Sequence, residues 1–126
     1  MLRGKHIAIN YKFVEKWPSY EEFERVDLRC GTIIRAENFL RAAKPAYKIW
    51  ADFGSEIGVL QTSAQVTVHY TPEILLGKKI VGCINLGEKN IAGFISNFLL
   101  VGFSDNNGAI CLASVDLEVP NGNKLH

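Results

Sequence analysis

The chain has few of the features that mark a disulfide-stapled or metal-bound protein. It contains only three cysteines in 126 residues, and no two of them form a Cys-x-x-Cys pair. Each cysteine lies among apolar neighbours, which is typical of a reduced thiol packed in a core. We therefore expect Cys30, Cys83 and Cys111 to be buried and inert, with neither a disulfide framework nor a cysteine metal site.

Long hydrophobic runs are also lacking. No apolar stretch reaches the roughly 18 residues that a membrane-spanning helix needs, and the segment after residues 1–5 is too short and too polar for a secretory signal. With 48% apolar residues, a chain of this length can still close its own core. The sequence predicts one compact cytoplasmic domain with no membrane insertion.

Motifs of catalysis and cofactor binding are absent from the sequence. His6, His69 and His126 are widely separated and lack metal-ligand spacing. Ser63 has no G-x-S-x-G context, and no glycine-rich loop has the form that binds phosphates. The aspartates fall near predicted element ends, where caps and turns account for them. We predict a protein that is not an enzyme and that holds no metal or cofactor.

The net charge of +1 argues against a strongly basic, nonspecific nucleic-acid binder, but the charges are unevenly distributed. Five basic residues and one glutamate lie within residues 29–48, and three further lysines lie within residues 78–89. If the two basic segments share a face, the protein carries a positive patch that the total conceals. A solvated surface of mixed charge is the alternative.

Hydrophobic alternation and turn residues predict mainly β structure. Residues 1–18 alternate like a half-buried edge strand, or form a trailing arm, up to Pro18. Ser19 and Glu22 have the spacing of a capping box, so a helix is expected over about 20–26, with Phe23 and Val26 placed to plug another element. Strands are expected over 28–39, 46–53, 57–61, 80–86, 98–103 and 109–115.

Helical connections and tight turns link these strands. Residues 62–70 contain a weak helical pattern, and a clearer helix begins at Pro72 and ends at Gly77. Gly31 suits a bend or bulge, and residues 104–108 (SDNNG) form a strong hairpin signal. This order matches a five-stranded Greek-key barrel of the oligonucleotide/oligosaccharide-binding (OB) kind, with an SH3-like barrel or a sandwich as the alternative.

Polar residues interrupt the most apolar segment, residues 78–103. Asn85, Ser96 and Asn97 lie inside or beside hydrophobic runs. Such side chains must be hydrogen-bonded within the fold or must face a partner. The segment is therefore either a buried hairpin with satisfied ends or part of a binding site.

Several separated segments together resemble a known family. They include FERVDLRCGTIIRAENF (23–39), KPAYKIWADFGSEIG (44–58) and IAGFISNFLLVG (91–102). The chain resembles the CsaA-like proteins of the tRNA-binding-domain superfamily over residues 23–125. The resemblance implies an OB-fold domain over 19–126 behind an N-terminal extension of residues 1–18. It also implies a homodimer that uses its terminal extensions, tRNA as a partner, and export-related chaperone binding of unfolded polypeptides.

The resemblance also assigns positions in this chain. Asn85 occupies the asparagine after the fourth strand and Ser96 the serine before the fifth, while Leu99 stands where free-standing tRNA binders commonly carry methionine. In place of the paired prolines common in CsaA-like chains, the turn reads LGEK, which allows a more flexible loop.

The charge pattern and the resemblance together define two sets of candidate residues. The residues expected to bind RNA through phosphate, sugar or base contacts are Arg41, Lys44, Lys48, Asn85, Lys89, Ser96 and Asn97. The apolar residues expected to line a polypeptide groove, or else to belong to the barrel core, are Phe39, Ile91, Phe94 and Ile95.

Overall fold

The computed structural model describes residues 17–126, so the strand or arm predicted for the N-terminal extension lies almost entirely outside the described residues. The described part is built mainly from short strands. Its elements are α2 (Tyr20–Arg25), β1 (Leu28–Asn38), β2 (Tyr47–Asp52), β3 (Val59–Ala64), α3 (Pro72–Leu75), β4 (Lys79–Cys83), β5 (Lys89–Ile91), β6 (Phe94–Ser96), β7 (Leu99–Leu100), β8 (Gly102–Ser104) and β9 (Ile110–Leu112).

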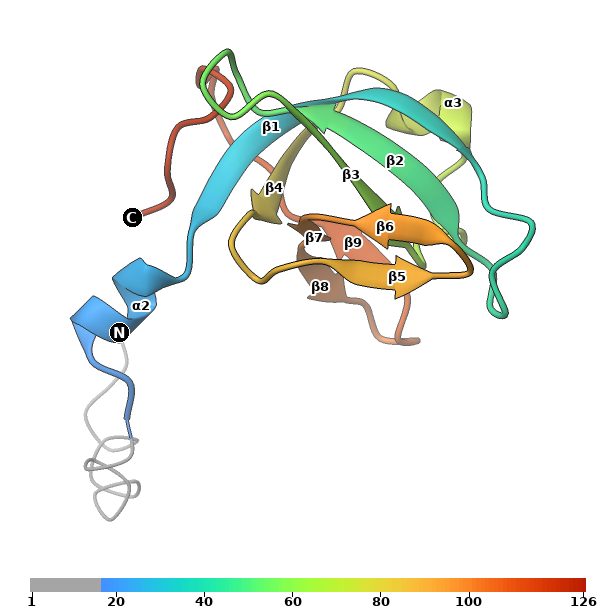
Figure 1. The fold of residues 1–126 in the computed structure, drawn as a ribbon, viewed down its shortest axis with the longest axis horizontal. Helices are drawn as coiled ribbons and strands as arrows, with labels where there is room; N and C mark the ends of the chain where they lie inside the picture. Colours follow the sequence, from blue (N-terminus) through green and yellow to red (C-terminus); the bar gives the residue numbers. More distant parts are fainter. Residues whose placement is uncertain (1–16) are drawn as a thin grey trace.

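Five antiparallel strands form the barrel, in the order β3-β2-β1-β4-β7. The hairpins β5–β6 and β8–β9 are separate two-stranded sheets, and both lie below the long strands in Figure 1. The predicted fold, a mainly β five-stranded barrel of the OB kind with short helices, is confirmed.

The core follows from the alternation of side chains along β2. Tyr47, Ile49 and Ala51 are buried, while the intervening residues face outward. Across the barrel, the rings of Phe53 and Phe98 meet edge to face with centroids 5.0 Å apart. This packing fixes the strands on which the surface residues are carried.

Helix α2 starts where the sequence predicts, but it does not plug the barrel. The capping box is present, since Ser19 Oγ accepts from the Glu22 amide at 3.0 Å and Glu22 Oε1 accepts from the Ser19 amide at 2.8 Å. No residue of the helix is buried, and both Phe23 and the C-cap Val26 are exposed. Helix α2 projects from the N-terminal end of β1 (Figure 1), so its apolar side chains stay largely exposed rather than entering the barrel.

The irregularity in β1 is not at the glycine. The register against β2 shifts between Ile33 and Arg35, which places the bulge near Ile34. Gly31 instead permits close packing, because a Cβ there would lie 2.9 Å from the Phe53 ring. The prediction of a bulge in this strand is right, and the position assigned to it is wrong.

Several predicted boundaries are wrong in the second half of the chain. Strand β3 continues to Ala64, so no helix spans 62–70, in keeping with the β-branched residues there. Strand β4 ends at Cys83, and the predicted strand over 98–103 is divided into β7 and β8. The β5–β6 hairpin was not predicted, because three-residue strands carry too little alternation to detect.

Two predicted features of this half are confirmed, namely the helix that begins at Pro72 and the hairpin turn of residues 104–108. Thr71 caps α3 and Gly77 has a positive φ of +83°. The β8–β9 hairpin turns at Gly108, and the C-terminal tail turns at Gly122, beside the carbonyl of Phe53. The backbone of tail residue Lys124 forms an isolated antiparallel β-bridge with the backbone of Arg29, and this pairing holds the tail along β1.

Two of the three cysteines are in the core, as predicted. Cys30 and Cys83 are buried, but Cys111 is exposed, so the expectation for that residue is wrong. Cys111 faces outward because its neighbours Ile110 and Leu112 take the inward positions of β9. No helix of residues 17–126 has the length and apolarity to cross a membrane.

Candidate nucleic-acid interface

A groove of about 800 Å³ lies on one side of the barrel. Its walls come from the β1–β2 loop, the end of β3, the loop between β4 and β5, and the residues around β7. Segments 42–46, 62–66, 86–89 and 98–102 therefore meet here although they are far apart in the sequence. Alanine, valine and leucine side chains make much of the lining, and exposed Leu99 is among them.

Two of the predicted RNA-binding lysines belong to this groove. Lys44 comes from the β1–β2 loop and Lys89 from the start of β5, and both are exposed. Neither forms an ion pair within residues 17–126, although Glu88 lies beside Lys89 in the lining. The two basic segments of the sequence thus contribute one lysine each to a shared groove.

Ser96 also lines the groove, but its hydroxyl is used within the fold. Ser96 Oγ accepts a hydrogen bond from the backbone amide of Ser63 at 2.9 Å. Asn97 Oδ1 accepts from the backbone amide of Gln61 at 2.9 Å, and the Asn97 amide donates to the Gln61 carbonyl at 2.9 Å. These side chains, which we call the seam, bind the outer edge of β3 and so close the barrel.

Asn85 has a similar internal role at the base of α2. Its Oδ1 accepts from the Asp27 amide at 2.9 Å, and its Nδ2 donates to the Arg25 carbonyl at 2.7 Å. The side chain is exposed and also borders a small cleft with residues of α2, outside the main groove. It therefore ties the end of β4 to the helix.

A cluster of cations and aromatic rings lies on the outer face of β1 and β2. Lys48 Nζ is 5.0 Å from the centroid of Phe39 and 5.2 Å from that of Phe94. Arg35 Cζ lies 4.5 Å from the Trp50 ring centroid, and Trp50 meets Phe94 edge to face. A cation and an aromatic ring in this arrangement attract each other.

This cluster joins residues that the sequence assigned to different ligands. Lys48 was predicted to bind RNA, whereas Phe39 and Phe94 were predicted to bind polypeptide. Arg35 and Trp50 were missed, although Trp50 follows Lys48 by two residues and so must share its face of β2. Phe39 is buried, so only part of the cluster is open to a ligand.

The remaining candidates lie elsewhere. Arg41 is exposed in the β1–β2 loop but does not line the groove. Ile91 lines the groove and is half-buried, while Ile95 is half-buried on β6, and its carbonyl accepts from Gln61 Nε2. The structure thus brings four candidates to the groove, namely Lys44, Lys89, Ser96 and Ile91.

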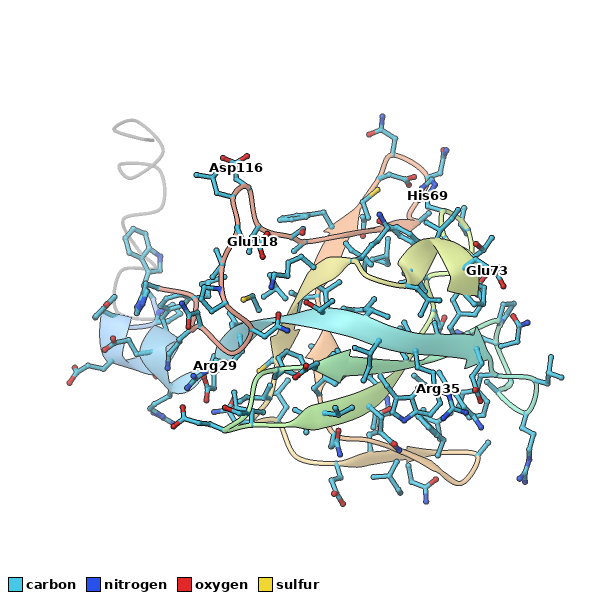
Figure 2. All side chains as sticks on the ribbon, turned by 90° about the horizontal axis from the view of Figure 1, so that it is seen from above. Arg29, Arg35, His69, Glu73, Asp116 and Glu118 are labelled. Carbon is cyan, nitrogen blue, oxygen red and sulfur yellow. The ribbon has the colours of Figure 1, made fainter. Side chains whose placement is uncertain are left out.

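Two basic residues outside the groove, Arg29 and Lys124, are engaged within the protein. Arg29 Nε donates to Asp27 Oδ1 at 2.6 Å, and Arg29 Nη1 donates to the Gly122 carbonyl at 2.9 Å. Hydrogen bonding from Arg29, with the charges of Arg29 and Lys124, holds the pKa of Asp27 below its ordinary value. Figure 2 shows Arg29 near α2 and the tail, well separated from Arg35 along β1.

Structural comparison finds proteins with the same barrel. The chaperone CsaA of Bacillus anthracis is 40% identical with a TM-score of 0.81, over 87% of this chain and 99% of that one. The CsaA chaperone of Picrophilus torridus is 37% identical, also with a TM-score of 0.81, over 87% of this chain and 100% of that one. A MetRS-related protein of Pyrococcus horikoshii is 27% identical with a TM-score of 0.77, over 87% and 98% of the two chains.

Sequence comparison relates the chain to one part of larger enzymes. It is 30% identical over 102 residues, 81% of its length, to the methionine–tRNA ligase of Methanocaldococcus jannaschii, of which it spans 15%. It is 33% identical over 105 residues, 83% of its length, to methionine–tRNA ligase 1 of Bacillus anthracis, again spanning 15% of the relative. The family model described as "Putative tRNA binding domain" matches residues 28–124. The chain belongs to this tRNA-binding-domain family and is a CsaA-like member of it.

Proposed function

We propose that this protein binds tRNA at the groove and acts by binding rather than by catalysis. The observation that carries the proposal is that Lys44 and Lys89, which are far apart in the sequence, line one groove in a chain of this family. Paired lysines without internal ion pairs are suited to phosphate oxygens, which supply much of the affinity for RNA. Such a function belongs in the cytoplasm.

The neighbouring surfaces extend this contact. Arg41, on the same loop as Lys44, adds a further exposed cation. Lys48 and the half-buried ring of Phe94 offer a charge beside an aromatic face, which suits an unpaired base and its phosphate. Direct hydrogen bonds to RNA from Asn85, Ser96 and Asn97 are a smaller part of the proposal. The side-chain oxygen of each residue already accepts a hydrogen bond from a backbone amide.

We propose a homodimer as the assembled form. Helix α2 exposes Tyr20 and Phe23, its C-cap Val26 is exposed, and Leu86 and Leu125 are also exposed. A group of exposed apolar side chains of this kind marks an interaction surface. Because α2 lies at the terminal end of the domain, we propose a second copy of the chain as the partner of this surface. A two-fold dimer would present two grooves to one folded RNA.

The test is tRNA binding at several salt concentrations. For the unmodified protein, affinity should fall steeply between about 50 and 200 mM salt, because bound phosphates release counterions. The double variant Lys44→Ala/Lys89→Ala should bind more weakly. The plot of log affinity against log salt has a negative slope, and the variant should reduce the magnitude of that slope by about 2, one unit per lost phosphate contact.

The matched control removes two lysines elsewhere. Lys78 stacks over Tyr70 and Lys124 contacts Asp27, and neither lines the groove. The variant Lys78→Ala/Lys124→Ala loses the same charge and should keep the slope of the unmodified protein. Equal slopes for the two double variants would show that the protein binds tRNA, if at all, by overall charge and not at the groove.

The apolar lining of the same groove supports a second function, the holding of unfolded polypeptides. Ile91 and Leu99 lie in the lining, so an extended chain could place apolar side chains there. Of the other candidates, Phe94 is packed between Phe39 and Trp50, and Ile95 lies on β6 outside the groove. The proposal therefore centres on Ile91 and Leu99.

Aggregation of a chemically unfolded client protein tests this second function. The unmodified protein should suppress light scattering, and Leu99→Ser should weaken the suppression without changing the free energy of unfolding by more than about 0.5 kcal/mol, since Leu99 is 51% exposed. Phe94→Ser is the companion variant on the aromatic cluster. Suppression that is absent in the unmodified protein, or unchanged in both variants, rejects polypeptide holding at these residues.

A further inference from the structure

A histidine, a carboxylate and a thiol meet beside the β8–β9 hairpin. His69 precedes α3, Asp105 follows β8, and Cys111 lies in β9. One potential ligand atom from each side chain lies within 4.8 Å of the other two. His69 and Asp105 are 36 positions apart, which is why spacing in the sequence did not indicate the cluster. Figure 2 shows His69 between this hairpin and α3.

The hairpin register places Asp105 and Cys111 on one face. Cys111 pairs directly with Phe103, and Asp105 follows Phe103 by two residues, so the two side chains project to the same side. Ile110 and Leu112 pack against the core, which directs Cys111 outward. The exposed thiol and the carboxylate are therefore neighbours because of the strand geometry.

The carboxylate is held in a fixed orientation by the turn. Asp105 Oδ1 accepts from the amides of Asn107 at 2.8 Å and Ala109 at 2.9 Å. Its other oxygen, Oδ2, lies 2.6 Å from Nε2 of His69. A carboxylate whose one oxygen is tied to the backbone while the other projects toward a histidine has the arrangement of an oriented metal ligand.

The segment that carries His69 is joined to the strand that carries Cys111. The hydroxyl of Tyr70 accepts from the amide of Leu112 at 2.9 Å, and the hydroxyl of Tyr47 donates to the Tyr70 carbonyl at 2.7 Å. His69 and Cys111 each directly precede one partner of the Tyr70–Leu112 bond. Their relative position is consequently fixed by the core and not by the surface side chains alone.

We propose that His69, Asp105 and Cys111 bind a divalent transition metal, with Zn²⁺ as the best match. Nitrogen, carboxylate oxygen and thiolate sulfur are the ligands that Zn²⁺ takes, and the thiolate disfavours Mg²⁺ and Ca²⁺. Three protein ligands leave a fourth position for water. The metal would link the β8–β9 hairpin to the segment before α3.

Binding requires only a small side-chain movement. Zinc–ligand bonds of about 2.0–2.2 Å in a tetrahedral site separate nitrogen and oxygen by roughly 3.3 Å. The His69–Asp105 contact of 2.6 Å must therefore open slightly, and the 41% exposure of the His69 side chain leaves room for its ring to turn. In the absence of metal the same two residues form an ion pair or hydrogen bond, so the cluster remains satisfied.

Cobalt and zinc titrations of the untagged, reduced protein test this site. One equivalent of Co²⁺ should produce a thiolate-to-cobalt charge-transfer absorption, and Zn²⁺ should displace it. Cys111→Ser should abolish that absorption and weaken Zn²⁺ binding by at least about tenfold, and His69→Gln should weaken Zn²⁺ binding to a similar extent. Asp116→Asn, an exposed carboxylate in the tail, should leave both unchanged.

Both outcomes are decisive. An absorption that depends on Cys111, together with weaker Zn²⁺ binding in His69→Gln, supports the site. A lack of thiolate absorption, or equal Zn²⁺ affinity in the unmodified protein and both ligand variants, overturns it and leaves His69 and Asp105 as a simple surface pair. The tRNA measurements do not depend on this result, because none of the three ligands lines the groove.

Discussion

Ser96 and Lys89 face each other as register partners in the β5–β6 ladder, yet they use their polar atoms differently. Ser96 is 9% exposed, and its oxygen accepts the Ser63 amide. Lys89 is exposed, and it forms no ion pair within residues 17–126. The seam of Ser96 and Asn97 therefore serves the fold, while the groove lysines Lys44 and Lys89 remain available to a ligand.

The difference follows from the hydrogen-bonding requirements at each position. The outer edge of β3 carries backbone amides that would be left without partners if the barrel did not close over them, and unpaired buried amides are costly. Short polar side chains at Ser96 and Asn97 solve this problem. The side chains of Lys44, in the β1–β2 loop, and Lys89, at the start of β5, are exposed to water and have no such requirement.

The largest expected effect comes from opening the seam. The double variant Ser96→Ala/Asn97→Ala leaves the amides of Ser63 and Gln61 without their side-chain acceptors. Each loss should cost about 1–3 kcal/mol, so the free energy of unfolding should fall by about 2–6 kcal/mol in total. Urea denaturation measures this change directly.

Ser63→Ala is the matched control for the seam. Its backbone amide still donates to Ser96, and only a 3.4 Å contact between the two hydroxyls is lost. Its stability should change by less than about 0.5 kcal/mol. If the double variant is as stable as this control, the seam does not close the barrel and Ser96 and Asn97 become stronger candidates for ligand contact.

A second comparison uses two glycines with the same backbone conformation. Gly122 has φ of +94° in the tail and Gly87 has φ of +87° in the groove loop. A Cβ at residue 122 would lie 2.5 Å from the Phe53 carbonyl oxygen, whereas one at residue 87 would meet nothing within 4 Å.

Gly87→Ala should therefore lower the free energy of unfolding by about 1–2 kcal/mol, which is the cost of placing an alanine in the left-handed conformation. Gly122→Ala adds a clash with fixed backbone and should cost about 3 kcal/mol or more. Thermal or urea unfolding of both variants measures the difference. Similar losses at the two sites would mean that the tail moves freely and is not held against the barrel.

The sequence predicted the parts of the fold that depend on local pattern. The capping box of Ser19 and Glu22, the helix start at Pro72 and the hairpin turn of residues 104–108 each rest on a few adjacent residues, and each is present. The helix over 62–70 failed because pairing with β2 extends β3 to Ala64. A sheet partner is a long-range contact that local propensity does not contain.

The candidate site was predictable to a similar degree. The two basic segments, within residues 29–48 and 78–89, could be identified in the sequence, and the structure brings one lysine from each, Lys44 and Lys89, to one groove. The internal partners of Asn85 were not predictable, because Asp27 is 58 positions away. His69, Asp105 and Cys111 form a cluster only through the fold for the same reason.

The smallest expected effect concerns acid stability at the junction of α2, β1 and the tail. The pKa of Asp27 is lowered in the folded protein by the hydrogen bond and charge of Arg29 and by the charge of Lys124. A carboxylate with a lowered folded pKa stabilises the protein at pH values above its unfolded pKa, and this contribution is lost as the pH falls through the folded pKa. Asp27→Asn removes the titration, so the loss of stability between neutral pH and acid should become shallower than in the unmodified protein.

Urea midpoints measured from pH 7 down to about pH 3 provide the test, since the ordinary pKa of an aspartate lies near 4. Asp116→Asn is the control, because that exposed carboxylate has no ion pair within residues 17–126 and its removal should not change the slope. A steeper acid loss in Asp27→Asn would reverse the sign of the linkage. It would then follow that the contacts with Arg29 and Lys124 do not favour the ionised form of Asp27 in the folded protein.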